Sequence, residues 1–490
     1  MYEIPPPPRV TLRDNVRSTL GHGQSQWKKW RLRIAMAITL EAIVVGASVG
    51  SAFVSSSGTL TTNTAFVHPS EGWTPLASYP CTGSTLPEGR LDPGMTYDYS
   101  WTYSSVVMVG GYNGCTPARD ANTFWYRGDT GGSNANGAWT TVTTTATTGT
   151  SLPSVSGGGL AYCPSQCVYL GPAASGDYYF GGYDGTYIYD TPYLLSGTVW
   201  STVCTPLTTY GCFYLPSSYY TVTCNEASLN VAITGMNLVW DPSDETLYMF
   251  GGYAEYNYGA NSAAGCGNVW YGGGVTDDMY YLTYDTTGFP TSPNIGWKAM
   301  CGEFATGTAC GPGNRAYAAM AYDPNSGDLV LYGGYGCTTP SLYGCTSPAV
   351  LTDTWYFHPD QTPGSAAWTQ CTSTSVDYQC PTAPSNGADA AFAYDAANGS
   401  LVLFGGCSSG VGGAAYFISS CTTPSSNTAV LGHWNGETYQ ATRTWVELGT
   451  LSPSPPALYG ARMVFDYSTG YLVLYGGSNY AQTWIYGYPH

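Results

Sequence analysis

The sequence predicts an all-β fold made of six repeated units, and three observations indicate it. Apolar residues recur in short alternating bursts separated by Gly, Pro, Ser, Thr and Asn, which is the pattern of short strands. An apolar run ends in a Gly-Gly pair six times along the chain, starting at positions 110, 181, 251, 333, 405 and 476. The pairs recur at a nearly regular interval, with four strand-like bursts per unit. A regular period of this kind is typical of a closed β-propeller.

Each unit contains the same elements in the same order. A hairpin precedes most Gly-Gly pairs, as in 321–334, where Asp and Gly supply the turn between the first and second strands. An aromatic third strand follows, as in 354–357, and a tryptophan then opens the fourth strand at positions 139, 200, 297, 368 and 445. Two places fit less well. In the second unit, 167–172 is an alternative second strand to 178–182, and His433-Trp434 is an unusual third strand.

The last unit has no tryptophan strand of its own. It ends at 483–486, whereas Trp73 precedes the first unit without a partner. We therefore expect the N-terminal strand to complete the last unit, which would leave no free sheet edge. The four features that recur in order resemble the kelch repeat family over most of the chain. This resemblance implies a six-bladed kelch-type β-propeller, closed by the N-terminal strand and spanning residues 71–490.

The segment before the repeats predicts a membrane anchor. Residues 1–33 form a tail with seven basic and two acidic side chains, 34–54 are mostly apolar, and 55–70 form a Ser/Thr-rich linker. A run of this length spans a bilayer as one transmembrane α-helix, and the positive-inside rule places the tail in the cytoplasm. We therefore expect a single-pass protein of the cell membrane with an extracytoplasmic propeller. A cleaved secretory signal is the alternative, and pilin-like processing near Ala35 is a third option.

The predicted span contains residues that indicate a partner. Glu41 lies inside the apolar run, and Ala42, Gly46 and Gly50 form a stripe of small residues at helical spacing. A carboxyl group in a bilayer is costly and usually faces a partner, and small residues let helices pack closely. We expect the helix to dock against other transmembrane subunits or a second copy of itself. Alternatively, a protonated Glu41 faces lipid near the cytoplasmic boundary.

All 16 cysteines lie at position 81 or later, in the part expected outside the cell. An even number of exported cysteines indicates disulfides rather than metal ligands. Most form short-range pairs, and the remaining four fall in loops that share one face of a propeller. Sequence does not fix connectivity, so the pairing is a hypothesis. The expected pairs are Cys81–Cys115, Cys163–Cys167, Cys204–Cys212, Cys224–Cys266, Cys301–Cys310, Cys337–Cys345, Cys371–Cys380 and Cys407–Cys421.

Three arginines are the candidate ligand-binding residues. Arg90, Arg315 and Arg462 each precede a first strand, near the predicted entrance of the central channel. If they converge there they can bind a carboxylate, as in sialidases and the kelch-type sialic acid mutarotases. The alternative is that each arginine braces the neighbouring blade.

Other chemistry is disfavoured. A copper oxidase of the galactose-oxidase type needs paired histidines, but those beyond the anchor lie in a linker, a third strand, an irregular loop and the terminus. We find no nucleophile elbow, phosphate-binding loop or zinc-ligand cluster, so no catalytic residue, metal or cofactor is predicted. Asp323, Asn325 and Asp328 resemble a calcium loop weakly, but the same turn recurs in other units with different side chains. We interpret Asp277-Asp278 as a solvated loop and Asn398 as an N-glycosylation acceptor.

The charge distribution excludes nucleic acid as a partner. Beyond residue 54 the chain has seven basic and 28 acidic residues, which cannot form a phosphate-neutralising patch. So few basic residues suit an acidic exterior, which suggests an acidophilic host. The sequence favours a non-enzymatic scaffold, accessory subunit or binding module of a membrane or cell-surface complex, with protein or glycan on its propeller face. The alternatives are a carbohydrate- or sialic-acid-handling enzyme using an axial Arg-lined pocket, and an adhesin or pilus-like component.

Overall fold

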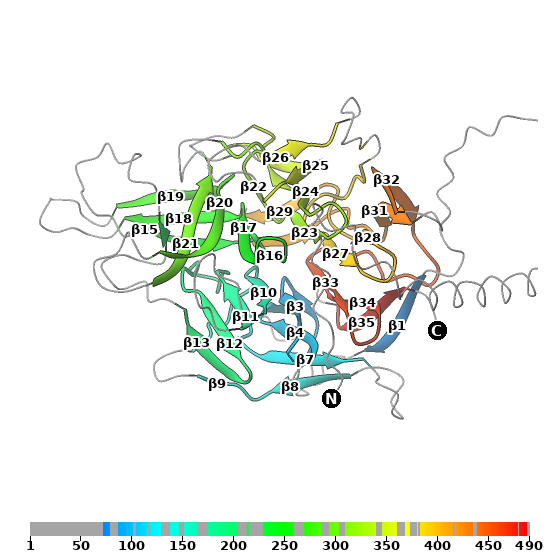
Figure 1. Cartoon of the computed structure of the whole chain (residues 1–490), viewed down its shortest axis with the longest axis horizontal. Helices are drawn as coiled ribbons and strands as arrows, with labels where there is room; N and C mark the ends of the chain where they lie inside the picture. The colour runs from blue at the N-terminus through cyan, green and yellow to red at the C-terminus, as the bar shows by residue number, and fades with distance from the viewer. Residues whose placement is uncertain are drawn as a thin grey trace, which may run out of the picture. The chain divides into compact units, whose positions relative to one another are not determined.

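The computed structural model describes residues 72–78 and, with internal gaps, 87–487 (Figure 1). The predicted tail, transmembrane span and linker, with Glu41, Ala42, Gly46 and Gly50, lie outside the described residues. The described residues form β-strands and no helix, so the prediction of an all-β fold is confirmed. Among them, no helix has the length and apolar character needed to cross a membrane.

Most strands belong to antiparallel sheets that we number in chain order. Sheet 1 contains β3 (Gly94–Asp98), β4 (Ser105–Val109), β7 (Thr123–Arg127) and β8 (Ala138–Val142). Sheet 2 contains β10 (Gly159–Cys163), β11 (Gly176–Phe180), β12 (Tyr193–Ser196) and β13 (Val199–Thr202), with β9 (Thr145–Ala146) parallel to β13. Sheet 3 contains β16 (Asn237–Asp241), β17 (Thr246–Phe250), β20 (Met279–Asp285) and β21 (Asn294–Cys301). It is extended by β14 (Phe213–Tyr214), β15 (Leu229–Thr234), β18 (Tyr253–Tyr258) and β19 (Val269–Val275).

The second half of the chain repeats this arrangement. Sheet 4 contains β23 (Ala319–Asp323), β24 (Asp328–Gly336), β25 (Ala349–Phe357) and β26 (Trp368–Gln370), with β22 (Arg315–Ala316) on β24. Sheet 5 contains β27 (Ala391–Asp395), β28 (Ser400–Phe404), β31 (Thr428–Trp434) and β32 (Tyr439–Gly449). Sheet 6 contains β33 (Ala461–Asp466), β34 (Tyr471–Gly476), β35 (Gln482–Gly487) and β1 (Gly72–Ser78). Two small sheets join β2 (Arg90–Leu91), β5 (Tyr112–Asn113) and β6 (Ala118–Arg119), and pair β29 (Val411–Ala414) with β30 (Phe417–Cys421).

The first and last strands that the structure describes lie in one sheet. β1 pairs antiparallel with β35, with Trp73 opposite Tyr486, as the unpaired tryptophan predicts. In sheet 2, β11 pairs with β10, so the second strand is the one that contains 178–180. The alternative segment, 167–172, lies outside the described residues.

Each first strand packs beside the first strand of the next sheet. β3 contacts β10, and the contacts continue through β16, β23, β27 and β33, which contacts β3 again. Figure 1 shows these strands innermost in their sheets. The apolar core lies between the sheets, because each of six clusters of buried side chains draws its members from two consecutive sheets, the last joining sheet 6 to sheet 1. Burial of these faces is the main stabilising contribution.

The Gly-Gly pairs connect one sheet to the next through the backbone. In every pair the second amide donates a hydrogen bond of 2.7–2.8 Å to a carbonyl that precedes the first strand of the neighbouring sheet. The first glycine has φ between 65° and 80°, which L side chains rarely adopt. A Cβ at Gly333 would lie 2.7 Å from Cα of Gly387 and closer still to its carbonyl oxygen. Glycine is therefore required both for the conformation and for the close approach.

A second set of backbone hydrogen bonds runs around the first strands. One residue before each first strand donates its amide to the carbonyl of the equivalent residue before the preceding sheet, at 2.7–3.0 Å. The set closes, because the amide of Asp92, before sheet 1, donates to the carbonyl of Gly460, before sheet 6. All six residues have φ between 52° and 73°. We call them the ring residues, and they are Asp92, Gly157, Gly235, Tyr317, Asp389 and Gly460.

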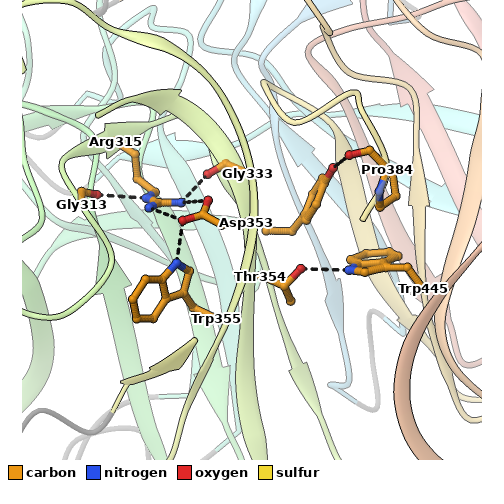
Figure 2. Close-up of polar contacts among 9 residues, drawn as sticks. Gly313, Arg315, Gly333, Asp353, Thr354, Trp355, Pro384 and Trp445 are labelled. Atoms are coloured by element: carbon orange, nitrogen blue, oxygen red, sulfur yellow. Dashed lines mark hydrogen bonds and ion pairs between the residues drawn. The ribbon is translucent and has the colours of Figure 1, made fainter. Parts of the chain in front are cut away.

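The fourth-strand tryptophans connect the sheets through side chains. Trp445 donates from Nε1 to Oγ1 of Thr354 in sheet 4 at 2.9 Å and packs on Tyr332 (Figure 2). Trp73, Trp139 and Trp200 donate to threonines at the same register of the preceding sheet. Sheet 3 has Met279 at this register. Accordingly, the buried indole N–H of Trp368, which packs on Phe250 of sheet 3, has no acceptor among the described residues.

The hairpin aspartates stabilise the turns between first and second strands. Asp323 Oδ1 accepts the amide of Asn325 at 3.0 Å, and its Oδ2 accepts the hydroxyl of Ser326. The carboxylates of Asp98, Asp241, Asp395 and Asp466 accept the equivalent amide in their own turns. Asp328, the third residue of the calcium-like pattern, contacts the His358 side chain through its carboxylate. These contacts match a structural turn rather than a calcium loop.

Four disulfides occur among the described residues. They join Cys301 to Cys310, Cys337 to Cys345, Cys371 to Cys380, and Cys407 to Cys421, as the sequence spacing predicts. Cys163 is also disulfide-bonded. Its predicted partner Cys167, and the cysteines at positions 81, 115, 204, 212, 224 and 266, lie outside the described residues. Disulfides persist in oxidising compartments, so these pairs fit an extracellular setting.

Substituting a Gly-Gly glycine should destabilise the fold through overlap as well as strain. We expect Gly333→Ala to lower the free energy of unfolding by roughly 3 kcal/mol or more, because the Cβ meets Gly387. Gly327→Ala is the matched control, since its φ of 76° is similar but a Cβ there meets nothing within 4 Å. The control should lose only about 1–2 kcal/mol of left-handed strain. Urea denaturation of the full chain in mild detergent, followed by tryptophan fluorescence, measures both. Equal losses would contradict this role for the Gly-Gly pair.

Removing the Trp445 acceptor should also be measurable. We expect Thr354→Val to lower the free energy of unfolding by roughly 1–3 kcal/mol, because it leaves a buried indole donor unpaired. Thr369→Val, at a half-buried position of the same sheet, should change it by less than about 0.5 kcal/mol. The same denaturation experiment tests both. A loss at position 354 no larger than at 369 would show that the hydrogen bond contributes nothing.

Candidate axial site

Arg315 is fully buried and is bound by its own sheet (Figure 2). Its guanidinium donates to the carbonyls of Gly313 and Gly333, both at 2.9 Å, and to both carboxylate oxygens of Asp353 at 2.6 and 2.9 Å. Asp353 also accepts the indole N–H of Trp355 at 2.7 Å. Burial alone would raise the pKa of Asp353, but the hydrogen bond and charge of Arg315 hold it below its usual value.

Arg90 makes the equivalent contacts in sheet 1. It donates to the Gly110 carbonyl at 2.9 Å and to Asp120 Oδ2 at 2.7 Å, and its Cζ lies 4.7 Å from the centre of the Phe124 ring. The Arg90 carbonyl accepts the Gly477 amide. Arg90 and Arg315 thus brace the junction at the Gly-Gly pair, in keeping with the structural alternative that the sequence leaves open. Neither side chain lines the cavity that lies among the first strands of the six sheets and is described below.

Arg462 has a different position and different contacts. Arg462 lies opposite Tyr475, the residue before the Gly-Gly pair of sheet 6. In the other sheets the residue at the equivalent position is Gly94, Gly159, Asn237, Ala319 or Ala391. Arg462 is therefore the one long side chain at a position otherwise occupied by small residues. It donates to Oδ1 of Asp92 at 3.0 Å and to Oδ1 of Asp389 at 3.1 Å, which joins sheet 6 to the ring residues before sheets 1 and 5.

The carboxyl groups that hold Arg462 are buried and electrostatically coupled. Burial raises the pKa of Asp92 well above its usual value, and the negative charge of Asp389 raises it further, while Arg462 lowers it. Oδ2 of Asp92 and Oδ2 of Asp389 are buried with no hydrogen-bond partner among the described residues. Burial lowers the pKa of Arg462, but the two carboxylates outweigh it and raise it overall.

Tyr317 completes this cluster. It is a buried ring residue, and burial, followed by the charges of Asp92 and Asp389, raises its pKa well above the usual value. Like Asp92 and Asp389 it is a non-glycine residue with positive φ, which is strained and concentrates at sites where surrounding contacts fix the backbone. Tyr317 also packs in an apolar cluster with Ile418 of the hairpin β29–β30, which the Cys407–Cys421 disulfide closes.

The cavity beside this cluster is small. Residues of all six sheets line it, and its apolar collar consists of Met95, Leu160, Leu238, Met320, Phe392 and Met463. Its volume is ≈ 110 Å³, whereas sites for organic ligands usually measure roughly 300–1,000 Å³. It can hold a few waters or a very small molecule. Of the three predicted arginines only Arg462 borders it, so the structure does not bring Arg90, Arg315 and Arg462 together as a carboxylate clamp.

The structure also describes Asp277-Asp278, predicted to be a solvated loop, and Asn398, the predicted glycosylation acceptor. Asp277 and Asp278 are buried rather than solvated. Asp277 accepts the Cys310 amide at 3.1 Å, and Asp278 accepts the hydroxyl of Tyr280 at 3.1 Å. The loop is polar because it satisfies these buried donors. Asn398, the predicted glycosylation acceptor, is half-buried and donates to Asp395 at 2.6 Å within its turn. Among the described residues no cluster of His, Cys, Asp and Glu could hold a metal ion.

The hairpin turn of sheet 3 contains two carboxyl groups that titrate near neutral pH. Burial raises the pKa of Asp241 to about 7, and the charge of Asp244 adds to this effect. Burial likewise raises the pKa of Asp244 to about 6. Both values exceed those of the unfolded chain, so the folded state binds more protons between about pH 4 and pH 7. Stability from these groups is fully present below about pH 4 and is lost as the pH rises through 6 and 7.

The fold should therefore be more stable in mild acid than at neutral pH. We expect the free energy of unfolding to fall by roughly 2–3 kcal/mol between pH 5 and pH 8, because Asp241 must ionise while buried. Asp241→Asn should flatten this part of the profile, because the amide does not titrate. Denaturation curves at half-unit pH steps measure the slope, and a rise in stability toward pH 8 would refute the prediction.

Comparisons with known proteins give no family for this chain. No protein-family model matches it. No curated protein matches it either. Among solved structures, one chain in a cryo-EM structure of RAG in complex with one melted RSS and one unmelted RSS aligns over 85% of this chain and 99% of that chain. The two share 10% sequence identity with a TM-score of 0.43, a likeness too distant to bear on function.

Proposed function

We propose that the chain forms a closed six-bladed propeller of the kelch type, with sheets 1 to 6 as its blades. Three observations support this. The first strands contact one another in a series that returns to its start, the ring residues form a closed set of backbone hydrogen bonds, and β1 completes sheet 6. The Gly-Gly pairs and tryptophans that carry the kelch resemblance are the residues that join neighbouring sheets.

We further propose a non-enzymatic role, as an extracytoplasmic scaffold, accessory subunit or binding module. The observation that carries this proposal is the state of the three arginines. Arg90 and Arg315 are bound within their own sheets, and the charge of Arg462 is balanced by Asp92 and Asp389. An enzyme acting on a sugar acid at the axis needs an available guanidinium and a larger cavity. The enzyme alternative is therefore less well supported than binding.

A cluster of tyrosines at the hairpin turns supports a binding role. Tyr97, Tyr99, Tyr162 and Tyr467 come from sheets 1, 2 and 6, and their ring centres lie 4.9–5.6 Å apart. Tyr99 and Tyr467 are 43% and 49% exposed. Exposed tyrosines offer large contact areas at low entropic cost, which suits protein or glycan partners. We propose that this face meets the partner while the N-terminal helix holds the protein in the cell membrane.

The membrane part of the proposal predicts stable partners that depend on Glu41. We expect mild-detergent extraction of the native protein to recover other membrane subunits, or a second copy, in fixed stoichiometry. Glu41→Leu should lose them, because the helix would no longer present a carboxyl group to its neighbour. Ile43→Leu, in the same apolar run, should retain them. Size measurement and mass spectrometry provide the readout. A lone monomer from the unmodified protein would overturn the scaffold proposal.

A further inference from the structure

Arg119 differs from the other buried or half-buried arginines because three aromatic rings surround it. Its Cζ lies 4.6 Å from the centre of Tyr183, 4.7 Å from Phe417 and 5.4 Å from Tyr112. Its Nε donates to Oγ of Ser156 at 3.2 Å. The rings belong to three separate regions: the β5–β6 pair, the loop after sheet 2's second strand, and the hairpin β29–β30. Packing therefore fixes the guanidinium before any ligand arrives.

No carboxylate of the described residues forms an ion pair with Arg119, whereas Arg90 and Arg315 each have one such partner and Arg462 has two. Its Nη1 and Nη2 atoms make no hydrogen bond to any described residue, and the side chain is half-buried. The charge of Asp184 acts on Arg119, and the Asp184 carboxylate accepts the amides of Thr186 and Tyr187 and the hydroxyl of Tyr189. Burial lowers the pKa of Arg119, with a partial offset from the neighbouring tyrosines and Asp184.

A guanidinium in this state is ready to bind an anion. It remains protonated at any physiological pH, its orientation is already fixed, and two parallel N–H donors match the geometry of a carboxylate. The turn 184–187 packs against it, since a Cβ at Gly185 would lie 2.7 Å from Nη1. The same turn exposes Tyr187, which is 68% exposed and the most exposed large apolar side chain of the described residues. A flat ring beside a pair of guanidinium N–H donors suits a sugar that carries a carboxylate group.

We propose that Arg119 and the turn 184–187 form a binding site for a carboxylate-bearing sugar, such as a uronic acid unit of a glycan. Arg119 Nη1 and Nη2 bind the carboxylate, and Tyr187 packs against the sugar ring. The net charge of the whole chain, −17, disfavours a polyanion, so we propose a ligand with a single acidic unit. The inference rests on the proposed binding role and gives it a ligand class and a site distinct from the axial cavity.

Calorimetric titration of the full chain in detergent tests the proposal. The probes are a glucuronate-terminated trisaccharide and its glucose-terminated counterpart. We expect the glucuronate form to bind at least about tenfold more tightly, and Arg119→Met to remove this difference while keeping most of the packing volume. Arg127→Met is the matched control, because Arg127 is exposed and stacks on Trp125 at 5.9 Å. The control should change affinity by less than about twofold.

Competition experiments distinguish an acid-sugar site from a general anion site. Tyr187→Ala should weaken the trisaccharide but leave competition by acetate unchanged, because acetate uses only the arginine. Inorganic phosphate competing as well as the trisaccharide would overturn the sugar assignment in favour of a general anion site. Equal binding of the two trisaccharides, or unchanged binding by Arg119→Met, would overturn the site itself. Arg119→Met should still co-purify with the membrane subunits, so failure here is distinguishable from failure of the scaffold proposal.

Discussion

Backbone hydrogen bonds between neighbouring sheets are the contacts on which the rest of this structure depends. At each junction the second glycine of a Gly-Gly pair donates across to the next sheet, and a ring residue donates back to the sheet before. These bonds require two backbone segments to approach without a Cβ between them, which explains why glycine recurs at intervals along the sequence. Apolar side chains then fill the wedge between the sheets, and the indole of Trp445 reaches its threonine only because the spacing is fixed.

This constraint also explains the use of the scarce positive charges. Arg90 and Arg315 are buried at the junctions, where each donates to the carbonyl of the first glycine and to a nearby aspartate. Both side chains are buried and each is held by a carbonyl and a carboxylate, so their guanidinium groups serve the junctions. Arg462 serves the same purpose among the ring residues by joining Asp92 to Asp389. Among the buried and half-buried arginines that the structure describes, Arg119 lies outside this pattern.

The sequence predicts the fold better than the candidate site. Gly-Gly spacing and the unpaired Trp73 predict the second strands and the β1–β35 pairing, because both reflect contacts that recur in every unit. The axial cluster does not recur. Asp92, Tyr317 and Asp389 occupy ring positions where the other units have glycine, and only alignment of the units on their Gly-Gly pairs would have indicated them. Asp277-Asp278 has the pattern of a solvated loop because sequence does not reveal that the Cys310 amide needs a buried acceptor.

Departures from a repeat are therefore the places where function is best sought in this chain. A repeated residue is explained by the junction it serves, whereas a residue present in one unit must have another physical cause. The hairpin β29–β30 is such an insertion in sheet 5, closed by the Cys407–Cys421 disulfide, and it brings Phe417 against Arg119 of the first repeat unit. No junction requires this contact. Ile418 of the same hairpin belongs to a buried apolar cluster with Tyr317, so residues from distant parts of the sequence meet here. The insertion thus packs with Tyr317 of the strained cluster and against the guanidinium of Arg119, which links the most constrained part of the fold to the surface that we propose binds a ligand.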